Sequence, residues 1–166
     1  MDLLDRLLGH DEWTTALLLD RCSELSEAQI DQTFDIDHGS VRALLIHLTR
    51  NVEVWTDLMN EVPVRPRPDV PPTVADLKQR YAVAYGDFSS LARAVADSQR
   101  ENELWIDRLD NPPKSKTYGG AILHVITHNM HHRAHLLLML SRLGLTDLPE
   151  GDLLGWDTHF SRNSAG

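Results

Sequence analysis

Cysteine, lysine and long apolar runs are all scarce in this 166-residue sequence. The one cysteine, Cys22, cannot form an internal disulfide, which favours a reducing compartment. Only three lysines accompany a net charge of −9, which argues against a surface that binds nucleic-acid phosphates. No stretch approaches the ~20 apolar residues that span a bilayer, and the N-terminus lacks the features of a secretory signal. We therefore expect a cytoplasmic protein without nucleic-acid or membrane partners.

The short motifs of several enzyme classes are also missing. The sequence contains no Gly-rich phosphate loop, no His-Glu-x2-His helix and no Cys-x2-Cys pair. Nucleotide hydrolysis, zincin proteolysis and zinc-finger folding therefore lack their usual evidence. The Glu-x2-His motifs of di-iron helical bundles are absent as well, so a carboxylate-rich metal site is not expected.

Apolar residues at helical spacing dominate what is present. They predict four long helices and no strand, at residues 2–25, 40–60, 73–99 and 119–143. Ser40 and Thr73 are suited to capping the second and third helices, and Gly144 to ending the fourth. This pattern predicts an all-α four-helix bundle.

The connection between the second and third helices is rich in proline. Five prolines in residues 62–72 remove amide donors and fix φ, so this segment must be a surface loop or a long crossover. Residues 1–160 are expected to form a single domain of the predicted bundle. Residues 161–166 are expected to be a frayed tail.

Five of the nine histidines fall in the last predicted helix, and they occupy one ~100° arc of its surface: His124, His128, His131, His132 and His135. A His-x3-His pair places two imidazoles on adjacent turns, about 6 Å apart along the axis, where they can share one metal ion. The whole stripe is about 16 Å long, so the five cannot all bind the same ion. The pattern assigns no role to His131 or His135.

A third ligand must come from another helix, and His47 is the natural donor because its helical stripe is expected to face the bundle interior. Three neutral imidazoles leave coordination positions open, which is typical of catalytic zinc sites. Asn51, one turn beyond His47, either orients a ligand or is satisfied by a neighbouring helix. Trp13 is either a packing anchor or a pocket wall, and Arg133 is expected to face a carboxylate or solvent.

Two readings without catalysis stay open. The histidines could be incidental to a helical interaction protein, or they could serve a binding or sensing module. A cavity lined by Trp or Asn beside an open coordination position would favour an enzyme, and a fourth protein ligand would favour a structural or binding role.

The chain resembles the DinB/YfiT-like superfamily of bacterial four-helix bundles. The resemblance rests mainly on three segments of the sequence: His10-Asp-Glu-Trp13, the run from Gly39 to His47-Leu48, and His124-x3-His128-x3-His132-Arg133. The closing segments Leu143-Gly-Leu and Asp152-Leu-Leu-Gly-Trp156 also fit. It implies a divalent metal, zinc or nickel, held by a histidine triad of His47, His128 and His132, with His124 nearby. The usual family ending His-Arg-Gly-Gln is here His132-Arg133-Ala134-His135.

The resemblance also implies a function. The superfamily includes metal-dependent S-transferases that use low-molecular-weight thiols, such as bacillithiol or mycothiol, in detoxification or stress response. A metal-dependent hydrolase and a non-catalytic metal-binding or sensing bundle are the alternatives. The resemblance further implies a small-molecule substrate and a homodimer.

Overall fold

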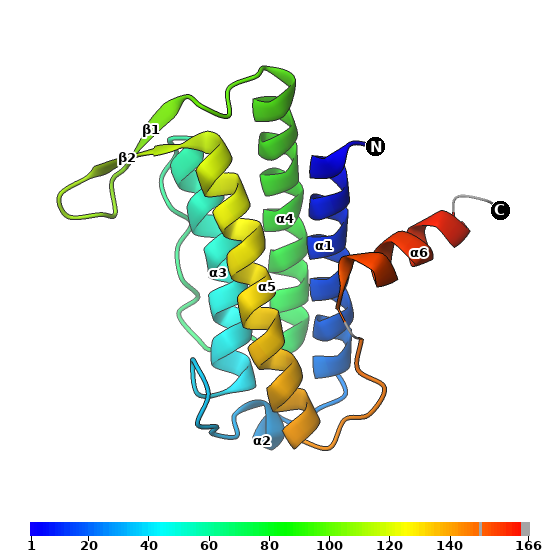
Figure 1. Cartoon of the computed structure of the whole chain (residues 1–166). Coiled ribbons are helices and arrows are strands. Elements are labelled where there is room, and N and C mark those ends of the chain that lie inside the picture. Colours follow the sequence, from blue (N-terminus) through cyan, green and yellow to red (C-terminus); the bar gives the residue numbers. More distant parts are fainter. Residues whose placement is uncertain (150, 164–166) are drawn as a thin grey trace. The chain divides into compact units, whose positions relative to one another are not determined.

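The computed structural model describes residues 1–149 and 151–163, and its helices and strands are drawn in Figure 1. The chain divides into two compact units. Unit 1 contains Met1–Leu45 together with the chain from Met130 onward, and unit 2 contains Ile46–Asn129. Two of the long helices run from one unit into the other. Within the described ranges, no helix combines the length and the apolar character needed to cross a membrane.

The four predicted helices are all present, each within three residues of its expected ends: α1 (Leu3–Cys22), α3 (Val41–Met59), α4 (Val74–Asp97) and α5 (Tyr118–Arg142). The predicted caps explain several of these boundaries. The Thr73 hydroxyl accepts a hydrogen bond from the Asp76 backbone N–H, and the Ser40 hydroxyl accepts one from Ala43. After α5, Gly144 has a φ of +88°, which glycine adopts without strain.

Two short helices and two strands complete the described elements: α2 (Glu27–Ile30), α6 (Leu153–Asn163), β1 (Leu104–Asp107) and β2 (Lys114–Thr117). The strands pair antiparallel, with Leu104 opposite Thr117. The prediction of no strand is therefore wrong, and the fold is mostly helical rather than all-α. Alternation of exposed and buried side chains holds for β1, but four residues are too short to give a clear period-two signal. Because α6 includes residues 161–163, only 164–166 of the predicted frayed tail remain, and these lie outside the described residues.

In unit 1, α1 is held by close packing and by a buried ion pair. A Cβ atom on Gly9 would lie 2.6 Å from the Trp156 ring, so glycine is needed where α6 approaches α1. Arg133 of α5 donates to the Asp11 carboxylate of α1, and both side chains are almost fully buried. This pair confirms the prediction that Arg133 faces a carboxylate. Burial also raises the pKa of the Cys22 thiol to about 12, so this thiol stays protonated and inert.

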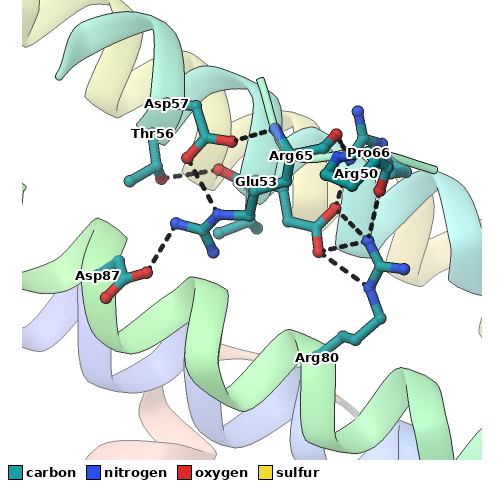
Figure 2. Close-up of polar contacts among 9 residues, drawn as sticks. Arg50, Glu53, Thr56, Asp57, Arg65, Pro66, Arg80 and Asp87 are labelled. Atoms are coloured by element: carbon teal, nitrogen blue, oxygen red, sulfur yellow. Dashed lines mark hydrogen bonds and ion pairs between the residues drawn. The ribbon is translucent and has the colours of Figure 1, made fainter. Parts of the chain in front are cut away.

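The proline-rich connection, residues 60–73, contains no helix or strand and is fixed to unit 2 by charged side chains. Figure 2 shows these contacts, which we call the arginine–carboxylate network: Arg50, Glu53, Asp57, Arg65, Arg80 and Asp87. From the connection, Arg65 donates to Asp57 through its backbone N–H at 2.8 Å and its Nε at 3.0 Å. Its Nη2 also donates to Asp87 of α4 at 2.6 Å.

Glu53 of α3 is the second carboxylate at the centre of this network (Figure 2). Arg50 donates to it at 2.7 Å, and Arg80 of α4 donates to it at 2.8 Å. The two guanidinium groups also donate to the main-chain carbonyl oxygens of Arg65 and Pro66, at 2.8 and 3.3 Å. The buried charge of Glu53 is thus paired on both sides, as a charge removed from water must be.

Candidate metal centre

Two of the predicted ligands, His47 on α3 and His128 on α5, meet within unit 2. Their Nε2 atoms are 2.9 Å apart, and both side chains are half-buried. Such a separation permits a hydrogen bond when one ring nitrogen carries a proton. It is also close to the about 3.3 Å between two nitrogen ligands that are each about 2.05 Å from a tetrahedral zinc ion. The donor pair therefore fits a divalent metal.

The third predicted ligand, His132, follows His128 by one turn of α5 and belongs to unit 1. Its side chain is only 4% exposed, and its Nδ1 lies 3.2 Å from Asp37 Oδ2. An imidazole whose Nδ1 faces a carboxylate coordinates a metal through its Nε2. The structure thus brings two members of the predicted triad together and places the third on the same helix.

His124 lies beside this pair. Its ring stacks on that of His128 with centroids 5.1 Å apart, and the centroid of its ring lies 4.9 Å from that of Trp55. Partial burial, together with the positive charge of Lys116, lowers the pKa of His124 below its ordinary value of 6.5. The imidazole of His124 is therefore neutral at pH 7.

Asn51 of α3 is satisfied by a neighbouring helix. Its Nδ2 donates to Asn129 Oδ1 of α5 at 3.0 Å, and both side chains are buried. Of the two roles that the sequence left open for Asn51, the structure therefore shows local satisfaction.

A cavity of about 480 Å³ opens next to His124 in unit 2, lined by Trp55, Lys116, Thr117, Gly120, Ala121 and His124. Its volume lies within the range of roughly 300–1,000 Å³ found for small-molecule sites. One wall is formed by Trp55, with Lys116 Nζ lying 4.7 Å from the centre of a Trp55 ring. The Lys116 ammonium is also paired with the buried Asp107 carboxylate of β1. Sequence reasoning offered Trp55 among the tryptophans that could wall a pocket, but it missed Lys116, which belongs to the hairpin strand β2.

Trp13, which the sequence offered as a pocket residue, lies on α1 in unit 1. Its ring centroid is 5.2 Å from that of His159 on α6. His10, from the same motif, donates through Nε2 to the Gly151 carbonyl oxygen at 2.8 Å. Within unit 1, the contacts of this motif join α1 to the C-terminal part of the chain.

A second group of possible ligands lies in unit 1, formed by Asp37, His131, His132 and His135. One ligand atom from each of these residues lies within 4.8 Å of all the others. Asp37 Oδ2 is 3.2 Å from Nδ1 of His132 and 3.7 Å from Nδ1 of His135. The His131 and His135 rings are 4.5 Å apart between centroids. This arrangement of one carboxylate and three imidazoles could hold a metal ion.

Asp37 is the member of this group that sequence reasoning missed. Partial burial raises the pKa of its carboxyl group, but positive charge on His38 and His132 lowers the pKa more, so it lies below the ordinary value. Asp37 precedes a tight turn in which His38 and Gly39 have φ angles of +63° and +76°. The sequence Asp37-His38-Gly39 was the one hint of a turn at this position. Nothing in its spacing indicates which helix the turn contacts.

Comparisons with known proteins agree with this fold. The sequence profile of the DinB family matches residues 1–154. The structure is similar to that of YjoA, a DinB-like protein from Bacillus subtilis, with a TM-score of 0.63, 14% identity and coverage of 90% of this chain and 96% of that one. A conserved protein from Enterococcus faecalis gives a TM-score of 0.57 at 12% identity, covering 84% of this chain and 96% of that one. No curated protein matches the sequence.

Proposed function

This chain belongs to the DinB family, and from that premise we propose that it is a divalent-metal-dependent enzyme whose ion is held by His47, His128 and His132. The approach of the His47 and His128 Nε2 atoms to 2.9 Å carries this proposal. His132 is the natural third ligand because it lies one turn beyond His128 on α5. Zinc and nickel both suit imidazole ligands.

An enzyme is favoured over a purely binding module by the cavity in unit 2. Three imidazoles leave coordination positions open, as in catalytic metal sites. The cavity of about 480 Å³ is lined by His124, whose ring stacks on the proposed ligand His128. A small-molecule substrate held against Trp55 would therefore lie near the proposed ion.

The reaction that we propose is transfer of a low-molecular-weight thiol, such as bacillithiol or mycothiol, to an electrophilic substrate in detoxification or stress response. A bound divalent ion supplies Lewis acidity, which lowers the pKa of a thiol or of water. In the transfer, the thiol loses its proton to water, a sulfur–carbon bond forms as the bond from that carbon to the leaving group breaks, and the leaving group departs into solvent with the electron pair of that bond. The residues around the cavity contribute orientation, with Trp55 as a flat apolar wall. Metal-dependent hydrolysis is the alternative reaction for the same site.

The setting of this enzyme is part of the same proposal. We infer a cytoplasmic homodimer in which α1, α3, α4 and α5 form a single four-helix bundle. Family membership and the four long helices support the bundle. The net charge of −9 argues against nucleic-acid partners.

Metal content tests the ligand set directly. After loading with Zn²⁺ and removal of excess metal, we expect His47→Ala, His128→Ala and His132→Ala each to lose one equivalent of zinc, measured by elemental analysis. His159→Ala removes an exposed imidazole of α6 and serves as the matched control, with zinc content unchanged. Equal zinc content in the wild type, His47→Ala and His128→Ala would contradict the proposal.

The pH dependence of binding is a second expectation. An imidazole must be neutral to bind a metal, so zinc affinity should fall as the pH drops through about 6.5. Titration with Zn²⁺ at pH 7.5, 6.5 and 5.5 measures this fall. An affinity that is unchanged down to pH 4 would argue against histidine ligands.

A further inference from the structure

His135 occupies the position of the glutamine in the usual family sequence His-Arg-Gly-Gln, and its surroundings suggest a role for it. Its Nδ1 atom is buried and makes no hydrogen bond to any described residue. The nearest acidic group is Asp37, whose Oδ2 lies 3.7 Å away. A buried imidazole nitrogen normally has a hydrogen-bond partner, so this arrangement requires an explanation.

The spacing around Asp37 matches metal coordination better than direct hydrogen bonding. Charge-assisted hydrogen bonds between nitrogen and carboxylate are usually about 2.7–2.9 Å long. Asp37 Oδ2 is instead 3.7 Å from His135 Nδ1. Two ligands of one tetrahedral zinc ion are separated by about 3.3 Å, which is nearer to this distance than the length of a hydrogen bond is. An ion of this size therefore fits between these two atoms.

His131 supplies another imidazole at the same place. It precedes His135 by four residues on α5, the spacing that lets two helical histidines share one ion. The two rings are 4.5 Å apart between centroids, and a ligand atom of His131 lies within 4.8 Å of those from Asp37 and His135. Both residues to which the sequence pattern gave no role thus converge on one carboxylate.

We propose that Asp37, His131 and His135 form a second divalent-metal site in unit 1, separate from the proposed ion of His47, His128 and His132. Two imidazoles and one carboxylate favour borderline ions such as Zn²⁺ or Fe²⁺ and leave further positions open to water or a ligand. His132 lies beside the second site and faces Asp37 through Nδ1. The first ion would be coordinated by its Nε2. The second site shares no ligand with the first, so it does not depend on the proposed function.

Isothermal titration of metal-free protein with Zn²⁺ tests this proposal. We expect the wild type to bind two equivalents, and Asp37→Asn and His135→Gln to bind one. His47→Ala should also bind one equivalent, because it removes the other site. His159→Gln is the matched control and should bind two. Far-UV circular dichroism checks that each variant is folded, and either Asp37→Asn or His135→Gln suffices if the other does not fold.

The outcomes separate this second site from the proposed enzyme site. If the wild type binds a single equivalent that is lost in His135→Gln and kept in His47→Ala, the second site is supported and the proposed triad fails. Two equivalents in both His135→Gln and Asp37→Asn would overturn the second site. Loss of the same single equivalent in His47→Ala and His135→Gln would also overturn it, because one mixed site would then explain all binding.

Discussion

Glu53 in unit 2 and Asp37 in unit 1 are both single carboxylates shared by several nitrogen-bearing side chains, yet they are built differently. Glu53 is 3% exposed and accepts hydrogen bonds of 2.7–3.0 Å from Arg50 and Arg80. Asp37 is 43% exposed, and its nearest imidazole nitrogens, on His132, His38 and His135, are 3.2, 3.6 and 3.7 Å away.

This difference shows how the choice of cation separates a structural contact from a functional one. A guanidinium is charged at every accessible pH and cannot bind a metal, so Arg50 and Arg80 can only hold Glu53 in place. An imidazole loses its charge near neutral pH and then offers a lone pair. The looser group around Asp37 therefore suits an exchangeable ion, while the tighter group around Glu53 is permanent.

The largest change in stability is expected when the permanent group around Glu53 is broken. Glu53→Gln leaves the Arg50 and Arg80 charges without their carboxylate, which should lower the free energy of unfolding by about 3 kcal/mol. Urea denaturation followed by circular dichroism measures this change. Glu103→Gln is the matched control, because its pair with Arg100 is exposed and should leave the stability unchanged. A loss in Glu53→Gln no larger than in the control would mean that the network does not stabilise unit 2.

A somewhat smaller change in stability is expected when zinc binds to the exchangeable group around Asp37. Free Zn²⁺ at 100 times its dissociation constant for the Asp37 site should stabilise the wild type by about 2.7 kcal/mol through that site alone. Thermal unfolding with and without Zn²⁺ measures the shift. Glu53→Gln should show the same zinc-induced shift as the wild type, because the network binds no metal. Loss of that shift in Glu53→Gln would show that the group around Glu53 and the group around Asp37 are not independent.

The smallest expected effect is the pH-dependent contribution of a third carboxylate, Asp107, to stability. Burial raises the pKa of Asp107, but its hydrogen bonds with Lys116 and the Leu109 backbone N–H lower the pKa more. Because the folded-state pKa is depressed, the contribution of Asp107 is complete above about pH 4 and is lost as the pH falls through the lower folded-state value. Asp107→Asn should therefore be less stable than the wild type by about 1 kcal/mol at pH 6.

The same two proteins are then compared in acid. The stability difference between Asp107→Asn and the wild type should shrink below pH 4, measured by urea denaturation at each pH. A difference that is constant from pH 6 to pH 2 would show that the charge of Asp107 plays no part.

The long helices could be predicted because periodicity and caps are local properties of the chain. Thr73 and Gly144 mark helix ends through chemistry that involves only a few neighbouring residues. The hairpin was missed because each strand has only four residues and its pairing is set by contacts such as that of Lys116 with Asp107. Tertiary contacts of this kind leave no periodic signal in the sequence.

The candidate sites were predictable to a similar extent. Helical spacing made the pair His131 and His135 visible, but not its carboxylate partner. Asp37 lies in an irregular segment some ninety positions earlier, at a turn whose positive φ angles depend on the whole fold. The sequence therefore identified histidines able to bind metal, and the structure was needed to find the acid beside them.

The proline-rich connection is held by its main chain rather than by the identity of most of its side chains. Arg50 and Arg80 bind the carbonyl oxygens of Arg65 and Pro66, and the next five residues, 67–71, are all exposed. Carbonyl groups are the same in every residue, so this stretch is open to replacement in a way that Arg65 is not. Residues 67–71 are thus the natural insertion point for an affinity tag or a fluorescent label on unit 2.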